Sequence, residues 1–343
     1  MNAAKFRQKY FQTNSVDPFL IPINISSPSE KISHTRKILL TGSCFTEHIG
    51  NHLTEMKFDV LQNPNGILFD PVSVARSLIS YIKPEMYGSE DIFLNNELWQ
   101  SWDHHSFFSN TNPQTTLEQI NHSQQRAHDV LKKTDWLIIT LGSAFSYSLV
   151  ENNRAVANCH RAPANWFKKR LLPVEEMLAL LDEAIHRLRD FNPGLHIIFT
   201  ISPVRHIRDG VIENNRSKAR LIEVVHHLVD KFDNTFYFPA YELVIDVLRD
   251  YRFYDKDLVH PNYMATNYVL EKFMENYVHP DARVLAEEIR QLTISKKHRP
   301  MHPETKAHQK FLNEQLLKTK VLAGKYPFLN FKEELDYFSG KSL

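Results

Sequence analysis

Short, uninterrupted apolar runs alternate with longer amphipathic stretches along this chain. The runs have the length and composition of buried strands, and they fall at residues 37–41, 57–61, 135–141, 195–201 and 235–238. Continuous runs of Val, Ile and Leu are typical of parallel strands, because helices cover both faces of a parallel sheet. We expect at least four of these runs to form a central parallel sheet.

Helix-like patterns separate the strands. They cover residues 45–58, 71–82, 116–133, 173–191, 216–232, 241–249 and 262–277. The start at 71 is the clearest, because Asp70 suits an N-cap and Pro71 suits the first helical position. Strands alternating with helices at this spacing predict an α/β fold built from right-handed crossover units, with helices on both faces of the sheet.

The remaining segments indicate how the chain is divided. Residues 1–33 look like an extended lead-in, and the Trp-, Phe- and His-rich stretch at 91–109 predicts a hairpin or a long loop. After Pro280 the pattern is helical and charged to about residue 320, and a loosely attached tail is expected beyond it. We therefore expect one domain over residues 1–280 and a helical C-terminal extension over 281–343.

Composition narrows the class of protein. Hydrophobic residues make up 42% of the 343 residues and charged residues 24%, with a net charge of +1. This balance gives no general attraction to nucleic acid or to an anionic membrane, and we expect neither partner. No run approaches the roughly 18 apolar residues of a membrane span, and residues 1–10 do not resemble a signal peptide. We therefore expect a cytoplasmic protein in which Cys44 and Cys159 are reduced.

Candidate chemistry follows the apolar runs, because sites in open parallel sheets form at the carboxyl ends of the strands. After the first run comes Gly-Ser-Cys-Phe at 42–45, which places Cys44 near a helix N-terminus. Free N–H groups and the helix dipole there are expected to lower the pKa of a thiol and are able to hold an oxyanion. The alternative is a Gly-Ser N-cap followed by a buried cysteine.

A second candidate stands late in the chain, where Asp257 precedes His260 by three residues. At this spacing the carboxylate can reach Nδ1 of the imidazole, which fixes the tautomer and leaves Nε2 free as a base. The alternative is an aspartate N-cap with a histidine packed beneath it.

Together these strings resemble a known superfamily. Residues 37–46 (KILLTGSCFT) resemble the strand and Gly-Asp-Ser block of the SGNH (GDSL-type) hydrolases, and residues 257–261 (DLVHP) resemble their final Asp-x-x-His block. Within that superfamily, Gly-Ser-Cys-Phe is similar to the name-giving motif of the GSCFA family. The strings NCHR at 158–161, SPVRH at 202–206 and LRDYRFY at 248–254 are also similar to that family.

The resemblance covers roughly residues 38–277 and implies a fold and a reaction. The fold is a flavodoxin-like three-layer α/β/α sandwich with a central parallel sheet, followed by C-terminal helices. The reaction is acyl-ester hydrolysis or acyl transfer. Cys44 stands where the superfamily has its nucleophilic serine, and Ser43 takes that role if the turn is one residue shorter. His260 would be the base and Asp257 would orient it.

The resemblance also implies oxyanion donors. Gly66 fits the second block, whose glycine N–H donates to the oxyanion. The third block normally has Gly-x-Asn, but here Gly142 and Ser143 are followed by Ala144. The asparagine donor is missing, so Ser143 or another group must replace it, or the rate falls by on the order of a hundredfold or more.

Further polar residues are candidates for substrate binding. These are His104, His105, Asn158, His160, Arg161, Arg205 and His206. The alternatives are an ordinary aromatic hairpin around residue 104, a polar loop around residue 160 and an ordinary ion pair at Arg205. By analogy with the superfamily, the substrate is a small molecule or carbohydrate that carries an acyl ester, and no cofactor is expected.

Two other functions compete with this reading. One is a zinc-dependent hydrolase that uses Cys44, Cys159, His160 and His260, although no CxxC or HExxH spacing supports it. The other is a carbohydrate-binding protein that keeps the fold without turnover, which the missing asparagine and the missing Gly-Asp-Ser favour.

Overall fold

The computed structural model describes residues 20–341, so the first part of the expected lead-in lies outside the described residues. Its centre is a sheet of parallel strands in the order β10-β9-β5-β1-β2. The strands are β1 (Lys37–Gly42), β2 (Asp59–Gln62), β5 (Trp136–Leu141), β9 (His196–Ile201) and β10 (Thr235–Phe238). All the expected strands are therefore present.

The strand order is that of the flavodoxin-like fold, in which the second strand in chain order lies at one edge and the first lies beside it. Ile38 of β1 pairs with Val60 of β2 on one side and with Trp136 of β5 on the other. The order of the chain reverses between β1 and β5. The carboxyl ends of these two strands form the topological switch point, where ligands bind in folds of this kind.

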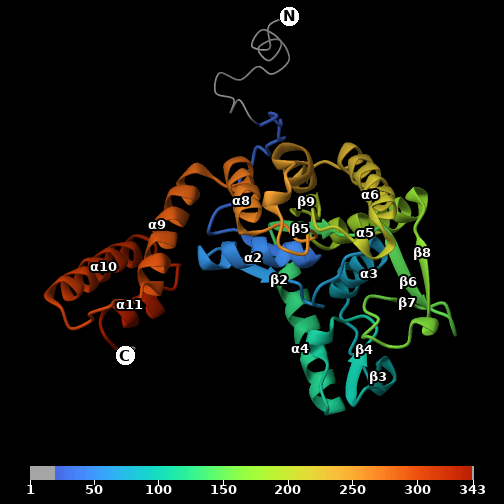
Figure 1. Cartoon of the computed structure of the whole chain (residues 1–343). Helices are drawn as coiled ribbons and strands as arrows, with labels where there is room; N and C mark the ends of the chain where they lie inside the picture. Colours follow the sequence, from blue (N-terminus) through green and yellow to red (C-terminus); the bar gives the residue numbers. More distant parts are fainter. Residues whose placement is uncertain (1–19, 342–343) are drawn as a thin grey trace, which may run out of the picture.

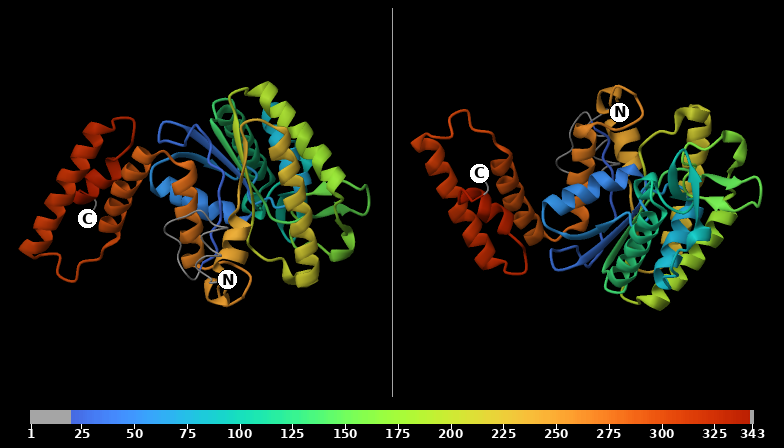
Figure 2. Two further views of the ribbon diagram at one scale, coloured as in Figure 1. Left: turned by 90° about the horizontal axis from the view of Figure 1, so that it is seen from above. Right: turned by 90° about the horizontal axis from the view of Figure 1, so that it is seen from below.

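Helices cover both faces of the sheet (Figures 1 and 2). On one face lie α2 (Cys44–Glu55) and α8 (Tyr263–Tyr277), and on the other lie α3 (Pro71–Ile82), α4 (Pro113–Leu131), α5 (Val174–Phe191) and α6 (Val211–Lys231). Successive strand residues point to opposite faces, so Leu39 packs under α3–α6 while Leu40 packs under α2 and α8. The chain has the expected three-layer α/β/α fold.

Two small antiparallel sheets flank this core. The expected hairpin at 91–109 is present as β3 (Ile92–Asn95) and β4 (Leu98–Ser101). The sheet formed by β6 (Phe145–Leu149), β7 (Ala155–Val156) and β8 (Phe167–Leu171) was not expected from the sequence. Short 3₁₀ turns, which are Ser89–Asp91, Ser106–Phe108, Ala164–Trp166, Ile207–Asp209 and Tyr251–Phe253, connect these elements.

Several helix boundaries differ from expectation. Helix α4 begins at Pro113, because Asn112 accepts hydrogen bonds from the backbone N–H groups of Gln114 and Thr115. Helix α6 begins at Val211, earlier than expected. The helix expected at 241–249 is a single α-turn, α7 (Ala240–Glu242), that continues as a π-helix over Leu243–Leu248. None of the helices within residues 20–341 is both long and apolar enough to cross a bilayer.

The C-terminal helices are α9 (Pro280–Lys297), α10 (Lys306–Lys325) and α11 (Lys332–Phe338), and they stand beside the core (Figure 2). The expected loose tail is wrong, because Phe331 and Phe338 are buried in a cluster with Leu285 and Leu322. Apolar side chains along α9, α10 and α11 supply enough burial to hold the end of the chain in place.

Candidate active site

The turn between β1 and α2 places Cys44 at the topological switch point. β1 ends at Gly42, whose φ of +142° is far from the values that other residues adopt. A Cβ at this position would lie 2.2 Å from the carbonyl oxygen of Thr140 in β5, so only glycine lets the strands approach this closely. The Ser43 N–H donates to that carbonyl over 3.1 Å, and α2 then starts at Cys44.

Cys44 is the more accessible of the two candidate nucleophiles. Its side chain is partly exposed, whereas Ser43 is buried and its hydroxyl has no hydrogen-bond partner in the described residues. Burial, followed by the charge of Glu47, raises the pKa of the Cys44 thiol, while Lys218 and the N–H of Phe45 act in the opposite direction. The expected lowering of this pKa is not found, because partial burial outweighs the helix terminus.

The spacing of Asp257 and His260 produces the expected pair. Asp257 Oδ2 lies 2.6 Å from His260 Nδ1, and Oδ1 accepts from the N–H groups of Val259 and His260 over 2.9 and 3.0 Å. These bonds, with that to the imidazole first, lower the pKa of the Asp257 carboxyl to about 2. The ring is thereby held with Nδ1 toward the carboxylate. In the described chain no hydrogen bond joins His260 to Cys44.

Arg205 ties this loop to the carboxyl end of β9. Its N–H donates to the carbonyl of Val259 over 3.2 Å, and its guanidinium donates to the carbonyl of Leu258 over 3.2 Å. The guanidinium also lies 4.1 Å from the ring centre of Tyr254. Leu258 adopts a left-handed φ of 58°. Arg205 was expected to bind substrate, but in this structure it holds the backbone directly before His260.

The backbone donors expected for the oxyanion have other partners. The N–H of Gly66 donates to the carbonyl of Asn63 over 2.7 Å. The N–H groups of Gly142 and Ser143 both donate to the carbonyl of Phe69, over 2.8 and 3.0 Å. These groups are therefore not free in this structure, and the donors that remain near the sulfur are the N–H groups of the first turn of α2.

A side-chain amide offers a donor that the sequence did not reveal. Asn63 follows β2, and its Oδ1 accepts from the N–H of Gly42 over 3.0 Å. Its Nδ2 is buried, and no hydrogen-bond partner for it exists among residues 20–341. A buried amide N–H without a partner is costly, so such a group is suited to a ligand that completes it. The only sequence signal was an Asn-Pro turn after a strand.

His206 lies beside the turn that follows β5. Its Nε2 is 3.5 Å from the point that a Cβ on Gly142 would occupy, and its ring centre is 5.7 Å from that of Phe69. Burial, followed by the charge of Lys218, lowers the pKa of His206 to about 4. The ring is neutral near pH 7 and hence a weak base. The charge of His260, a smaller effect, also lowers the pKa of His206.

The remaining histidine candidates are held by their own structural contacts. Nδ1 of His104 is 3.1 Å from the Ser101 hydroxyl, and burial lowers the pKa of this fully buried ring to about 4. His160 uses both ring nitrogens, with Nε2 2.7 Å from the carbonyl of Ser101 and Nδ1 3.1 Å from the hydroxyl of Ser106. Both rings contact Ser101 at the end of β4.

The neighbours of these histidines also have local roles. His105 packs on Gly66, where a Cβ would lie 2.2 Å from the His105 Cβ. The Asn158 side chain accepts from the N–H of His160 over 2.8 Å. Arg161 is exposed, with a left-handed φ of 58°. Burial raises the pKa of the Cys159 thiol to about 11.

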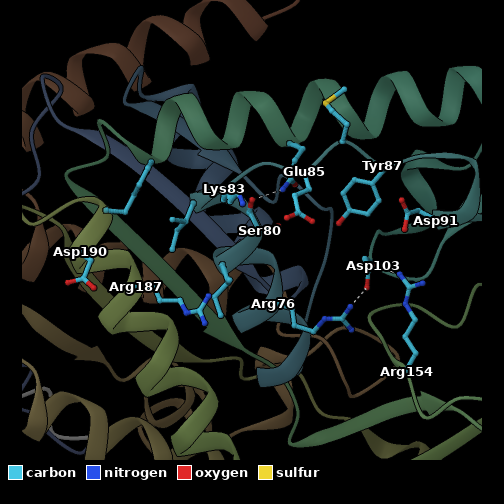
Figure 3. Close-up of a pocket in the computed structure, with 15 residues that line it drawn as sticks. Arg76, Ser80, Lys83, Glu85, Tyr87, Asp91, Asp103, Arg154, Arg187 and Asp190 are labelled. Atoms are coloured by element: carbon cyan, nitrogen blue, oxygen red, sulfur yellow. Dashed lines mark hydrogen bonds and ion pairs between the residues drawn. The ribbon is translucent and has the colours of Figure 1, made fainter.

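A large cavity opens beside α3 and α4. Its volume is about 980 Å³, and it is lined by α3, α4, α5 and the loops between them (Figure 3). Within it Asp103 forms an ion pair with Arg76 over 3.1 Å and accepts a hydrogen bond from Arg154 over 2.7 Å. Neither Cys44 nor His260 lines it. In the described part of the chain, no three His, Cys, Asp or Glu side chains converge as metal ligands.

Comparison with known proteins gives structural neighbours and a family. A carbohydrate esterase family 3 structure from Talaromyces cellulolyticus matches 75% of this chain and 99% of its own, with 8% identity and a TM-score of 0.36. An acetyl xylan esterase (Est2A) from the rumen bacterium Butyrivibrio proteoclasticus matches 71% of this chain and 63% of its own, with 9% identity and a TM-score of 0.34. A search of curated proteins found no match.

Two family models match the sequence. The model of the GSCFA family covers residues 37–273, which include the Cys44 turn and the Asp257–His260 pair. The model described as the GSCFA domain protein, C-terminal domain, covers residues 289–341. The chain belongs to the GSCFA family.

Proposed function

We propose that this protein is an acyl-ester hydrolase in which Cys44 is the nucleophile, His260 the base and Asp257 the group that orients the base. The proposal depends mainly on one observation. A partly exposed thiol stands at the first position of α2, and a carboxylate-bound imidazole stands on a loop that Arg205 ties to the same edge of the sheet. The strand order and the first and last sequence blocks support a place within the SGNH hydrolases.

In the proposed reaction, Nε2 of His260 takes the proton of the Cys44 thiol as the sulfur attacks the acyl carbonyl carbon. The carbonyl oxygen becomes an oxyanion, and the N–H groups of Cys44 and Phe45 with Nδ2 of Asn63 are the donors proposed for it. The intermediate collapses to a thioester as the alcohol leaves with the proton from His260. Water, deprotonated by the same imidazole, then releases the acid and restores the thiol.

The accessibility of the side chains supports Cys44 over Ser43. A nucleophile must reach the carbonyl carbon, and the Ser43 hydroxyl is buried behind the turn. Replacement of water by an alcohol in the second step would make the protein an acyltransferase. We propose a carbohydrate-linked acyl ester as the substrate class. The free thiols Cys44 and Cys159 support a reducing, cytoplasmic location.

A second candidate function is ligand binding without turnover. It is favoured by the raised pKa of Cys44 and by the engaged N–H groups of Gly66, Gly142 and Ser143. In that case the same edge of the sheet holds a carbohydrate, and no acyl-enzyme forms. For a zinc enzyme, no supporting cluster of ligands is present among residues 20–341.

The test compares the two cysteines. Cys44→Ala is expected to reduce turnover of nitrophenyl acetate by at least about a thousandfold, because the nucleophile is lost. Cys159→Ala and Ser43→Ala, each confirmed as folded by circular dichroism, are expected to retain activity. Quenched wild-type reactions should carry an acetyl group on Cys44 by mass spectrometry. A wild type that binds ligand but hydrolyses no activated ester supports the binding protein instead.

A further inference from the structure

A buried lysine lies beneath the carboxyl edge of the sheet. Lys218 is on α6, and 1% of its surface is exposed. Its Nζ donates to the carbonyl oxygens of Gly142 and Ser202, each over 2.6 Å. These residues directly follow β5 and β9, so the ammonium group joins the ends of two central strands. The hydroxyl of Ser217, the residue before it, accepts from the N–H of Ala144, which also follows β5, over 2.7 Å.

The partners of Lys218 are unusual for a buried cation. Buried lysines normally pair with a carboxylate, because an unpaired charge is costly in a dry interior. In the described chain Lys218 has no ion pair, and besides the two carbonyls its Nζ lies 5.9 Å from the ring centre of Tyr241. Two carbonyls use two of its three N–H groups.

The Cys44 turn lies next to one of the carbonyl partners of Lys218. Gly142, whose carbonyl binds Nζ, lies against Ser43, with 3.2 Å between the Ser43 Cβ and the point that a Gly142 Cβ would occupy. The electrostatic influence is mutual. The Cys44 sulfur raises the pKa of Lys218 against the larger effect of burial, and Lys218 lowers that of the Cys44 thiol.

We propose that Lys218 is a positioning residue whose buried positive charge stabilises the thiolate of Cys44. Its role in catalysis rests on the proposed function, but its effect on the thiol does not. The other ionisable groups around this position are Glu47 from α2, His206 and His260 from the loops, and Tyr241. Glu47 opposes the thiolate, and His206 is neutral near pH 7, so the protonated form of Lys218 is the source of positive charge on the α6 side.

The experiment measures the thiol directly. In a Cys159→Ser chain only Cys44 is left to alkylate, and the rate of reaction with iodoacetamide follows the thiolate fraction. Lys218→Met removes the charge and the hydrogen bonds, Lys218→Gln removes the charge but keeps amide donors, and Lys218→Arg keeps the charge. The pH profile of the alkylation rate is recorded for each folded variant.

If the charge of Lys218 matters, Lys218→Gln should lower the alkylation rate; if only its hydrogen bonds matter, Lys218→Gln should keep the wild-type rate. We expect alkylation near pH 6, below the Lys218 pKa of about 7, to slow by about tenfold or more in both Lys218→Met and Lys218→Gln, with a return toward the wild-type rate in Lys218→Arg. Glu47→Gln should change the rate in the opposite direction, and Lys231→Met, on the exposed face of α6, should leave it unchanged. A Lys218→Gln profile equal to that of the wild type overturns the proposal, because only the hydrogen bonds would then matter.

Lys218→Gln also guards against a variant that fails to fold, because it keeps N–H donors for the strand-end carbonyls. The readout involves no ester. If the thiol responds to Lys218 while the wild type hydrolyses nothing, the inference about the charge stands and the proposed function fails. If esters are hydrolysed but the alkylation rate of the thiol does not change with Lys218, the proposed function stands and the inference about the charge fails.

Discussion

Lys218, His206 and Asp257 show how their surroundings set the charge of single residues at this edge of the sheet. Burial lowers the pKa of Lys218 to about 7 and that of His206 to about 4. Asp257 is exposed, and its bond to His260 lowers its pKa to about 2. Near neutral pH the carboxylate is ionised, His206 is neutral and Lys218 is close to its midpoint. A small change in pH therefore alters the charge beside Cys44.

Lys218 should make the free energy of unfolding depend on pH. Its pKa is about 7 in the folded chain and near 10.5 when unfolded, so between these values the unfolded chain binds more protons. The free energy of unfolding should then rise with pH in this window, by on the order of 1 kcal/mol per pH unit at most. Urea unfolding from about pH 7 to 8, below the ordinary pKa of a free thiol, should show this rise in the wild type and in Lys231→Met.

Lys218→Met should lose the rise. A slope that is the same in Lys218→Met and in the wild type would mean that the lysine does not change its protonation on unfolding, and hence that its pKa is ordinary in the folded chain.

Residues with local partners were predictable from the sequence, and residues with distant partners were not. Asp257 and His260 are three positions apart, so their spacing revealed the pair. Lys218 bonds to a carbonyl 76 positions away. The contact of Arg205 with the carbonyl of Leu258 was not foreseen, because Leu258 lies 53 positions later in the chain. Nothing near these side chains in sequence indicates what they contact.

The junction of β1 with α2 depends on one glycine. Gly42→Ala would place a methyl group 2.2 Å from the Thr140 carbonyl at a φ of +142°. We expect a loss of at least about 2 kcal/mol in the free energy of unfolding. Gly324→Ala is the matched control, because a Cβ there meets nothing within 4 Å and the residue lies within α10. It should stabilise by up to about 1 kcal/mol. Urea titration of both variants measures the difference, and equal effects would contradict the clash.

Elements with a strong periodic signal were predicted well. Each central strand is a continuous apolar run, and such a run is buried on both faces in any arrangement of the other elements. β6 was missed because Phe145–Leu149 is only partly buried and mixes serine with aromatic residues. The start of α6 was missed because its N-cap is Gly210, which has no side chain to bind the first N–H groups. Asn112 and Pro113 are a typical N-cap and first helical residue, so the sequence did contain a signal for the start of α4. The expected start at residue 116 did not make use of it.

At the scale of the whole molecule, α9 joins two packed regions. Ala282 and Ala286 pack with the core under α2 and α8, whereas Leu285 and Ile289 pack with α10 and α11. We propose that the chain comprises a hydrolase-like domain over residues 1–280 and a helical extension over 281–343. Because α9 contributes to both clusters, the extension is fixed to the core by a helix rather than by a flexible linker.

Lys57 and Glu334 form the second attachment. Their side chains are 18% and 6% exposed and meet over 3.0 Å, and Lys57 also donates to the carbonyl of Asn330 over 2.8 Å. Lys57→Met should reduce the free energy of unfolding by about 3 kcal/mol, because it leaves a buried carboxylate without its partner. Adding Glu334→Leu should recover much of the loss. Lys297→Met breaks the exposed pair with Glu55 and should cost less than about 1 kcal/mol. If Lys57→Met costs no more than Lys297→Met by urea unfolding, the pair is not an anchor.

The order of the strands also determines how the protein meets copies of itself. β2 and β10 form the edges of the central sheet, and each has only four residues. A strand from another molecule would find few unpaired backbone groups there on which to extend the sheet. At the start of β2, Asp59 is exposed and paired with Lys37, so a neighbouring strand would also have to bury charge. Short edges, one of them charged, disfavour aggregation through the sheet.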